Sequence, residues 1–468
     1  MVTGDRVHAF TGDALGEHDA VGLAELVRDG QVSPRELADA AAARARAVEP
    51  QLNAIVFDAL DNPRLPTTKG GRFYGVPSFV KDNTDVRGMP TGHGSAAFRA
   101  RPAKQDTDYT RQFLSTGVSV LGKTTLSEFG LSPTTEWAGR EPTRNPWHTG
   151  YSVGASSGGS AALVAAGVVP FAHGNDGGGS IRIPAACAGL VGLKPSRYRH
   201  VDGPQARQLP IKLVSEGVLT RTVRDTAAYL AAAEEFWRNP ALRPVGMVHG
   251  PGTRELRVGL LIDTVTGAQV DPQTKATVEQ TASLLEKAGH SVEPVAAPVG
   301  TEFVADFLQY WELLADVITL TGKLSFDRSF DSGELDPLTR GLARGHRAHL
   351  LRTPGALLRL RKAAADYARA FDRFDIVVSP VLAHITPPLG YLSPAIAFDV
   401  LLQRLTDYVG YTPLQNVAGA PGISLPMGLA AEGVPIGVHL SAAHGDERTL
   451  LEAAYTLEAA QPFPRIQP

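Results

Sequence analysis

Two serines set among glycines are the residues of this chain best suited to chemistry. Ser156 lies within the glycine-rich residues 154–159, and Ser180 follows three consecutive glycines at residues 177–179. Because glycine has no Cβ, the backbone before Ser180 can curl and direct several amides toward one negatively charged oxygen. The pattern indicates an oxyanion hole beside a nucleophilic serine, and these are the parts that acyl transfer needs.

A base for such a serine is present at Lys81, in a run of extended character over residues 76–82. Side chains of a strand alternate between its two faces, so Lys81 shares a face with Phe79 and points away from Asp82. If the Phe79 face is buried, desolvation lowers the pKa of the lysine, and no adjacent carboxylate raises it again. We therefore expect a buried lysine whose neutral amine accepts a proton from a serine hydroxyl.

With these residues the sequence resembles the amidase signature family, and the resemblance extends over nearly the whole chain. The matching segments follow the family's order and are weakest over residues 200–370. They are residues 81–82, 122–129, 144–147, 154–160, 176–182, 187–195, 416–426 and 435–438.

The resemblance implies a Ser-Ser-Lys triad. Ser180 matches the nucleophile, Ser156 matches a bridging serine that the family holds in a cis peptide bond, and Lys81 matches the base. In this scheme Ser180 passes its proton to Ser156, which passes its own to Lys81, and the alkoxide attacks the amide carbonyl. The protonated relay then donates to the departing amine, and water hydrolyses the acyl-enzyme. No metal or organic cofactor is needed.

Other residues near the nucleophile have supporting parts in the same scheme. The amides expected to hold the oxyanion are those of Gly177, Gly178, Gly179 and Ser180. Asp176 and Arg182 are expected to pair behind the loop and fix its shape, and Ser157 is expected to support it as well.

Two departures from the family pattern lie close to these motifs. Asn175 stands where threonine or serine is usual, and the Arg-Tyr-Arg-His of residues 197–200 replaces the common Gly-Arg-Val. We expect both changes to lie near the substrate or behind the reacting groups, because the three triad residues are intact. They leave open a reduced activity or a purely binding role.

Two other motifs compete with this interpretation. Residues 154–158 fit the Gly-x-Ser-x-Gly elbow of α/β-hydrolases, which would give an esterase with His439 or His444 as base. That elbow needs a buried strand directly before it, whereas residues 145–151 have the composition of a turn. Residues 117–124 fit the spacing of a phosphate-binding loop, but the order of helix and strand around them is inverted, which disfavours nucleotide binding.

Strand-like and helical segments interleave along the chain, which predicts an α/β fold with a large mixed sheet covered by helices on both faces. Strands are expected near residues 76–81, 117–121, 257–262, 375–381, 422–427 and 434–440. Ser33 and Glu36 form a capping box, with Pro34 at the first helical position, which predicts a helix that ends near Val48. The apolar run at residues 161–172 predicts a buried core helix.

Residues 301–373 are predominantly helical, and in the family this zone forms a cap over the active site. We expect a single amidase domain over residues 1–468 with this cap inside it. Apolar side chains of the cap and of residues 396–414 are predicted to line a pocket for a hydrophobic acyl or aryl group. They are Phe303, Phe307, Tyr310, Trp311, Leu313, Leu314, Phe398, Leu401, Leu402, Leu405, Tyr408 and Tyr411. Such a pocket favours hydrophobic amides over glutamine, and a glutamine-hydrolysing subunit of an amidotransferase complex stays as the alternative.

Composition excludes several other classes of protein. The 468 residues carry a net charge of -3 and are 43% hydrophobic and 20% charged, which fits a globular enzyme and gives no support for binding to nucleic acid or membranes. The single cysteine, Cys187, excludes an internal disulfide, and the histidines show no metal-ligand spacing. Residues 1–16 lack the apolar core of a signal peptide. We expect a cytoplasmic enzyme that acts on a small-molecule amide, with a homodimer left open.

Overall fold

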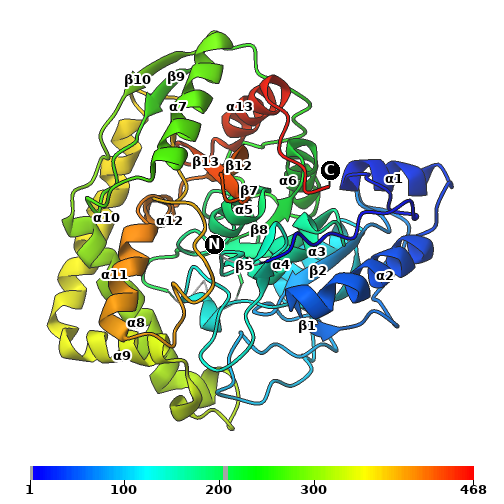
Figure 1. Cartoon of the computed structure of the whole chain (residues 1–468), viewed down its shortest axis with the longest axis horizontal. Helices are drawn as coiled ribbons and strands as arrows, with labels where there is room; N and C mark the ends of the chain where they lie inside the picture. The colour runs from blue at the N-terminus through cyan, green and yellow to red at the C-terminus, as the bar shows by residue number, and fades with distance from the viewer. Residues whose placement is uncertain (1–3, 204–208, 468) are drawn as a thin grey trace.

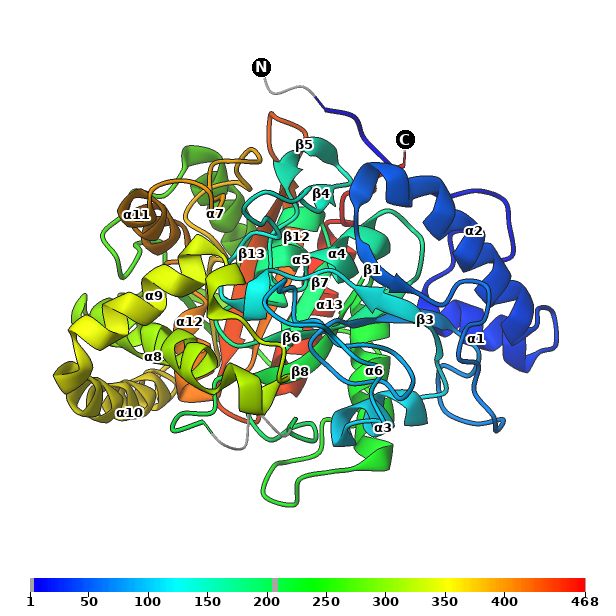
Figure 2. The same cartoon turned by 90° about the horizontal axis from the view of Figure 1, so that it is seen from below.

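A large mixed β-sheet forms the centre of the molecule, and helices cover both of its faces (Figures 1 and 2). The computed structural model describes residues 4–203 and 209–467. The α/β fold expected from the sequence is confirmed. The first three residues of the stretch 1–16, considered above for a signal peptide, lie outside the described residues. Within the described ranges no helix combines the length and the apolar character needed to cross a membrane.

The helices and strands of the described residues have the following bounds. The helices are α1 Ala20–Arg28, α2 Pro34–Leu52, α3 Asp108–Ser115, α4 Gly158–Ala165, α5 Arg182–Ala188, α6 Val223–Phe236, α7 Pro272–Lys287, α8 Glu302–Ser325, α9 Pro337–Ala348, α10 Thr353–Ala370, α11 Phe398–Tyr408, α12 Pro413–Ala418 and α13 Glu447–Ala460. The strands are β1 Ile55–Asp58, β2 Pro77–Lys81, β3 Ser119–Thr124, β4 Arg144–Asn145, β5 His148–Ser152, β6 Phe171–Asp176, β7 Val191–Lys194, β8 Ser215–Thr220, β9 Arg257–Leu260, β10 Ser291–Pro294, β11 Ile376–Pro380, β12 Gly422–Leu429 and β13 Pro435–Ala442.

The main sheet has, within the described residues, eight strands in the order β10-β9-β11-β13-β12-β7-β8-β6. The pairs β10–β9 and β9–β11 are parallel, and the remaining pairs are antiparallel. Helices α6, α7 and α13 pack on one face, and α4 and α5 pack on the other. Strand β6 therefore lies at an edge, and it ends at Asp176, directly before the candidate nucleophile loop.

A smaller sheet, in the order β1-β3-β2, lies against this edge. Strand β2 runs parallel to β3, and β1 runs antiparallel to it. Ser78 of β2 donates through Oγ to the carbonyl of Phe171 on β6, at 3.0 Å. Strands β2 and β6 therefore lie side by side from their first residues, and they end in Lys81 and Asp176 respectively.

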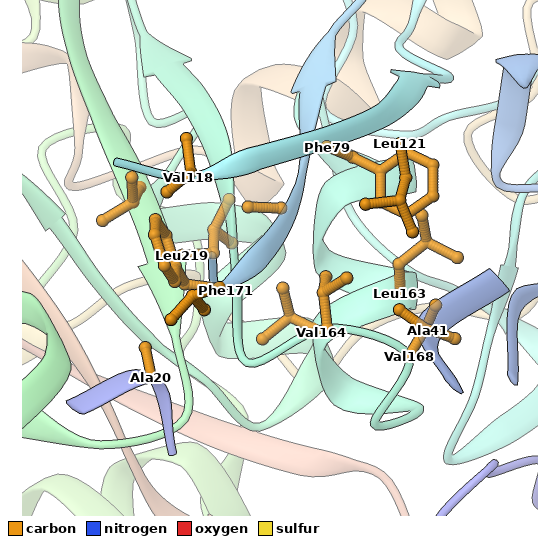
Figure 3. Packing of buried hydrophobic residues seen from close by; sticks show 14 of the residues in the cluster. Ala20, Ala41, Phe79, Val118, Leu121, Leu163, Val164, Val168, Phe171 and Leu219 are labelled. Carbon is orange, nitrogen blue, oxygen red and sulfur yellow. The ribbon is translucent and has the colours of Figure 1, made fainter. Parts of the chain in front are cut away.

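Apolar side chains fill the junction between the two sheets (Figure 3). Phe79 of β2, Leu121 of β3 and Leu163 of α4 are completely buried in one cluster, together with Ala41 of α2 and Phe171 of β6. Each square ångström of apolar surface that leaves water contributes roughly 25 cal/mol, so this cluster fixes β2 against β6.

Helix α2 begins as its sequence predicts. Ser33 Oγ accepts a hydrogen bond from the Glu36 amide at 3.2 Å, and the Glu36 carboxylate accepts one from the Ser33 amide at 2.8 Å. The helix runs past the expected end near Val48 to Leu52, where Asn53 closes it in the left-handed conformation at φ 50°.

Two expectations about local structure are wrong. Residues 161–172 are not one helix, because α4 ends at Ala165, Gly167 turns the chain at φ +78°, and β6 begins at Phe171. Short buried helices and strands have similar apolar compositions, so this run does not distinguish them by pattern. Residues 145–151 are not only a turn, because they contribute to the two-stranded hairpin of β4 and β5.

Candidate active site

Lys81 ends strand β2 and is completely buried. Burial lowers the pKa of Lys81 to about 7, against the opposing effect of the carboxylates of Glu216 and Asp176. Asp82 turns the other way and forms a buried ion pair with Lys123 at 3.1 Å. The lysine is therefore buried, as expected, and separated from the carboxylate that follows it in the chain.

Three oxygens surround the amine of Lys81. Nζ lies 2.7 Å from Ser156 Oγ, 2.7 Å from Asn175 Oδ1 and 3.3 Å from the Asn175 carbonyl. Both oxygens of Asn175 can only accept hydrogen bonds, so in a neutral amine they take its two hydrogens. The lone pair then faces Ser156, which is the orientation that proton transfer needs. The peptide bond between Ala155 and Ser156 is cis, as the resemblance implied.

Asn175 is held in turn by Asn83. The two side-chain amides form a reciprocal pair, with Asn83 Nδ2 donating to Asn175 Oδ1 at 3.2 Å and Asn175 Nδ2 donating to Asn83 Oδ1 at 3.1 Å. The departure from the family pattern at residue 175 therefore lies in direct contact with the candidate base, behind the reacting groups rather than on the cavity wall.

Asp176 organises the loop that leads to Ser180. Its carboxylate forms a fully buried ion pair with Arg182 at 2.9 Å and accepts from Asn416 Nδ2 at 2.9 Å and from the amide of Ile181 at 3.1 Å. Although burial opposes ionisation, Arg182 holds the pKa of Asp176 well below its usual range. The loop is therefore built around a permanent negative charge, which Arg182 balances.

Of the amides expected to hold an oxyanion, that of Gly179 serves a different purpose. It donates to Asp176 Oδ1 at 2.8 Å, at a residue whose φ of +134° favours glycine. The amides of Gly177, Gly178 and Ser180 have no acceptor within residues 4–203 and 209–467. These three amides are the donors available for an oxyanion, and the expectation for Gly179 is corrected.

Ser157 ties the two serine segments together. Its Oγ donates to the carbonyl of Ser180 at 2.5 Å, and its amide contacts the same carbonyl at 3.3 Å. Ser156 is 2% exposed and Ser180 is 9% exposed, and Ser180 lies on the wall of a cavity. The sequence-predicted residues are thus brought together at one place, with Ser180 as the one of the two that an incoming molecule can reach.

The cavity beside Ser180 has a volume of about 160 Å³ and a predominantly apolar wall. Ala155 and Gly178 border it near Ser180, while Phe307 and Trp311 of α8 face Gly178 from the opposite side. Among the described residues that line it, none carries a formal charge.

An apolar pocket is present as the sequence predicts, but only about half of the predicted side chains line it. Those that line the cavity are Phe303, Phe307, Trp311, Leu402, Leu405 and Tyr411. The others pack behind the wall, because they lie on other faces of the same helices. They are Tyr310, Leu313, Leu314, Phe398, Leu401 and Tyr408.

The competing motifs lie in different surroundings. His439 contacts Arg182 and Ser379, and burial lowers its pKa well below the usual range, so it is not placed as a base for Ser156. Residues 117–124 run into strand β3, and Lys123 pairs with Asp82 instead of facing a loop.

The second departure from the family pattern, at residues 197–200, braces other elements. Arg197 donates to the carbonyls of Asn416 and Val417 on α12 and so supports the loop from behind. Arg199 forms an ion pair with Glu447 of α13. Glu447 lies far along the sequence from the candidate reacting residues. Cys187 is buried, and burial raises the pKa of its thiol to about 11, which disfavours the thiolate form.

Sequence reasoning missed four residues of the site: Asn83, Thr412, Gln415 and Asn416. Asn416 donates to the backbone carbonyl of Asp176 as well as to its carboxylate, and Thr412 Oγ1 donates to the carbonyl of Gly178 at 2.6 Å. Asn416 belongs to a segment that resembles the family. The sequence therefore shows the motif, but not the contacts that Asn416 makes with Asp176. In the described part of the chain no group of three or more His, Cys, Asp or Glu side chains could hold a metal ion.

Known proteins resemble this chain over nearly its whole length. The sequence profile of the amidase family matches residues 36–451. "Putative amidase AmiC" of Mycobacterium tuberculosis (strain ATCC 25618 / H37Rv) is 49% identical over 466 residues, which covers 98% of each chain. The 6-aminohexanoate-cyclic-dimer hydrolase of Paenarthrobacter ureafaciens is 34% identical over 489 residues, or 96% of each chain. A solved structure of 6-aminohexanoate cyclic dimer hydrolase has a TM-score of 0.87 at 31% identity and covers 98% of this chain and 99% of its own. The chain therefore belongs to the amidase signature family and is an amide-hydrolysing enzyme.

Proposed function

We propose that the enzyme cleaves carboxylic amides with a hydrophobic acyl or aryl group through an acyl-enzyme on Ser180. The observation that carries this proposal is the contact of 2.7 Å between Lys81 Nζ and Ser156 Oγ, at a fully buried lysine whose pKa is lowered to about 7. A buried neutral amine next to a hydroxyl is suited to accept its proton. Ser156 then acts as the relay between Lys81 and Ser180.

The chemistry proceeds in two halves. In the first, Ser180 Oγ bonds to the amide carbon while its proton passes to Ser156 and that of Ser156 passes to Lys81. The carbonyl oxygen becomes negative and accepts from the amides of Gly177, Gly178 and Ser180. The relay returns the proton to the leaving nitrogen, the C–N bond breaks, and in the second half water repeats the sequence on the ester.

The character of the cavity supports a hydrophobic substrate. Free glutamine carries a charged amino group and a carboxylate, and each needs a polar or oppositely charged partner when it leaves water. The wall is largely apolar, and none of its lining residues in the described part of the chain carries a charge opposite to either group. The name of the related 6-aminohexanoate-cyclic-dimer hydrolase specifies an amide built from methylene chains. We therefore favour a hydrophobic amide over the glutamine-hydrolysing alternative.

We further propose that residues 301–373 act as a cap within a single domain. Helices α8, α9 and α10 account for most of this segment. Phe307 of α8, Leu342 of α9 and Phe371, directly after α10, line the same cavity as Ser180. The cap would then select the substrate while the sheets carry the reacting groups.

An activity-based probe tests the mechanism. A fluorophosphonate should label the wild-type enzyme covalently, and Ser180→Ala should abolish the labelling and reduce amide turnover by several powers of ten, because no acyl-enzyme can form. Lys81→Ala should lower turnover by a similar factor.

His444→Ala serves as the control, since the esterase alternative needs a histidine base. We expect this variant to label normally. Loss of labelling in His444→Ala, with Lys81→Ala still active, would reject the triad in favour of that alternative.

A further inference from the structure

Most polar side chains on the cavity wall already donate their hydrogens within the protein. Four hydroxyl groups that line it donate to backbone carbonyls. They are Tyr367 to Ala442, Ser379 to Pro380, Thr406 to Leu402 and Tyr411 to Ile262. Such a group can donate to a ligand only by giving up a hydrogen bond that it already makes.

Gln415 differs from these hydroxyls. It lies on α12, lines the cavity and is 6% exposed. Its Oε1 accepts from Arg182 Nη1 at 3.2 Å. A guanidinium can only donate, so this contact determines which end of the side-chain amide faces Arg182. The Nε2 donor is consequently directed away from it.

The Nε2 atom of Gln415 is free and accessible. It has no hydrogen-bond partner within the described ranges 4–203 and 209–467, and it is not among the unpartnered polar atoms sealed from solvent there. Because Gln415 lines the cavity, the cavity is where this donor is accessible. A flip of the amide would lose the contact with Arg182, so the donor has a fixed direction. The hydroxyl of Ser132 on the same wall can instead rotate.

Helix α12 also touches the loop that carries the candidate nucleophile. Thr412, directly before α12, donates to the carbonyl of Gly178, and Asn416 donates to Asp176. Gln415 lies between these two anchors, and its partner Arg182 opens the helix that follows Ser180. The free donor is thus fixed to the same framework as the reacting groups.

We propose that Gln415 is a specificity-determining residue whose Nε2 donates a hydrogen bond to a second carbonyl oxygen of the substrate, apart from the amide that is cleaved. This inference rests on the proposed function and narrows its substrate class to hydrophobic amides with a further uncharged acceptor in the acyl part. In an apolar cavity a donor without an acceptor is costly, so a substrate that lacks the second carbonyl is disfavoured.

The test uses 4-nitroanilides of straight-chain acids, which release coloured 4-nitroaniline on hydrolysis. In one series a ketone carbonyl replaces one methylene at each successive position of the acyl chain, so that length and volume stay nearly constant. At one position we expect kcat/KM to exceed that of the all-methylene parent by about fivefold to tenfold, the effect of one additional hydrogen bond.

Two variants then examine the donor itself. Gln415→Glu keeps an oxygen for Arg182 but replaces the donor by a second acceptor, and Gln415→Met removes both groups at similar volume. We expect the preference for the ketone to disappear in both variants, whatever their absolute rates. Thr406→Val is the matched control and should keep the preference, because its hydroxyl is already bonded to the Leu402 carbonyl. Thermal unfolding checks that each variant folds.

The outcomes separate this inference from the function on which it rests. If the wild-type enzyme hydrolyses the series without preferring any ketone position, or if the preference survives in Gln415→Met, the role of Gln415 is rejected and the amidase mechanism stands. If the wild-type enzyme releases no 4-nitroaniline from any member, the proposed function fails for hydrophobic amides and the inference falls with it.

Discussion

At the scale of the residue, the proposed role of Lys81 as the base predicts the pH range in which the enzyme works. Its pKa is lowered to about 7 by burial, and only the neutral amine can accept the proton of Ser156. Below that value the neutral fraction falls about tenfold for each pH unit. We therefore expect kcat/KM for one amide to rise between about pH 5 and pH 7 and to level off above. A flat profile over this range would exclude Lys81 as the base.

Asn175 offers a way to move that profile. Its Oδ1 lies 2.7 Å from Lys81 Nζ, so Asn175→Asp places a negative charge beside the amine and favours the ammonium form. We expect the acidic limb of the pH profile to shift upward by about one to three pH units. Asn175→Thr restores the residue usual in the family and keeps a neutral acceptor, so its limb should stay near that of the wild-type enzyme. Equal profiles for both variants would contradict the proposed contact.

At this scale the sequence predicts some residues and not others. Lys81, Ser156 and Ser180 stand in distinctive local motifs, and the structure brings Lys81 and Ser156 into contact. The alternation along β2 even predicts that Lys81 and Asp82 separate. Gln415 and Asn416 act through contacts with Arg182 and Asp176, which lie more than two hundred residues earlier. No local pattern encodes such a distance, so these partners emerge only from the fold.

At the scale of the element, the loop before Ser180 depends on glycine at residue 179. A Cβ there would lie 2.5 Å from Thr412 Oγ1 and 2.6 Å from Ile183 Cδ1, at φ +134°. We expect Gly179→Ala to lower the free energy of unfolding by about 2–4 kcal/mol, from overpacking and backbone strain together. Urea unfolding measures this loss, and fluorophosphonate labelling should slow in parallel.

Gly390→Ala is the matched control for this substitution. Gly390 also has a positive φ, of +90°, but a Cβ there would meet nothing within 4 Å. Only the backbone strain remains, so we expect the free energy of unfolding to fall by about 1 kcal/mol and the labelling to be normal. Equal losses for the two variants would show that the contacts with Thr412 and Ile183 do not matter.

The elements themselves differ in how far the sequence predicts them. The six expected strand segments each overlap a strand, and the capping box of Ser33 places the start of α2. Strands β6, β7 and β8, which lie next to the site, were not predicted. They are buried along their whole length and show no alternation of apolar and polar residues, and without it a strand resembles a short buried helix.

At the scale of the whole molecule, Arg44 joins the N-terminal segment to the body. Its guanidinium binds the carboxylate of Asp13 at 2.6 Å and donates to the carbonyls of Gly16 at 2.8 Å and Gly167 at 2.7 Å, while the side chain is only 4% exposed. Arg44→Met would remove the guanidinium from all three acceptors, although Asp13 would still accept from Thr11, Leu15 and Gly16. We expect a loss of about 3 kcal/mol in the free energy of unfolding.

Arg35→Met provides the comparison, because Arg35 and Asp39 form an ion pair in which both side chains are 54% exposed. Exposed pairs of this kind contribute about 0.5 kcal/mol or less, so the unfolding midpoint in urea should hardly move. A similar shift for both variants would mean that burial of Arg44 is unimportant.

The link between Asp176 and Asn416 has a consequence for protein synthesis. The two residues are separated by 240 positions, yet the loop before Ser180 takes its shape partly from the Asn416 side chain. A nascent chain acquires Lys81, Ser156 and Ser180 early, in the first half of translation, while this brace is still missing. We therefore expect Ser180 to become reactive only when synthesis of the chain is nearly complete. An incomplete chain would then not attack the amides around it.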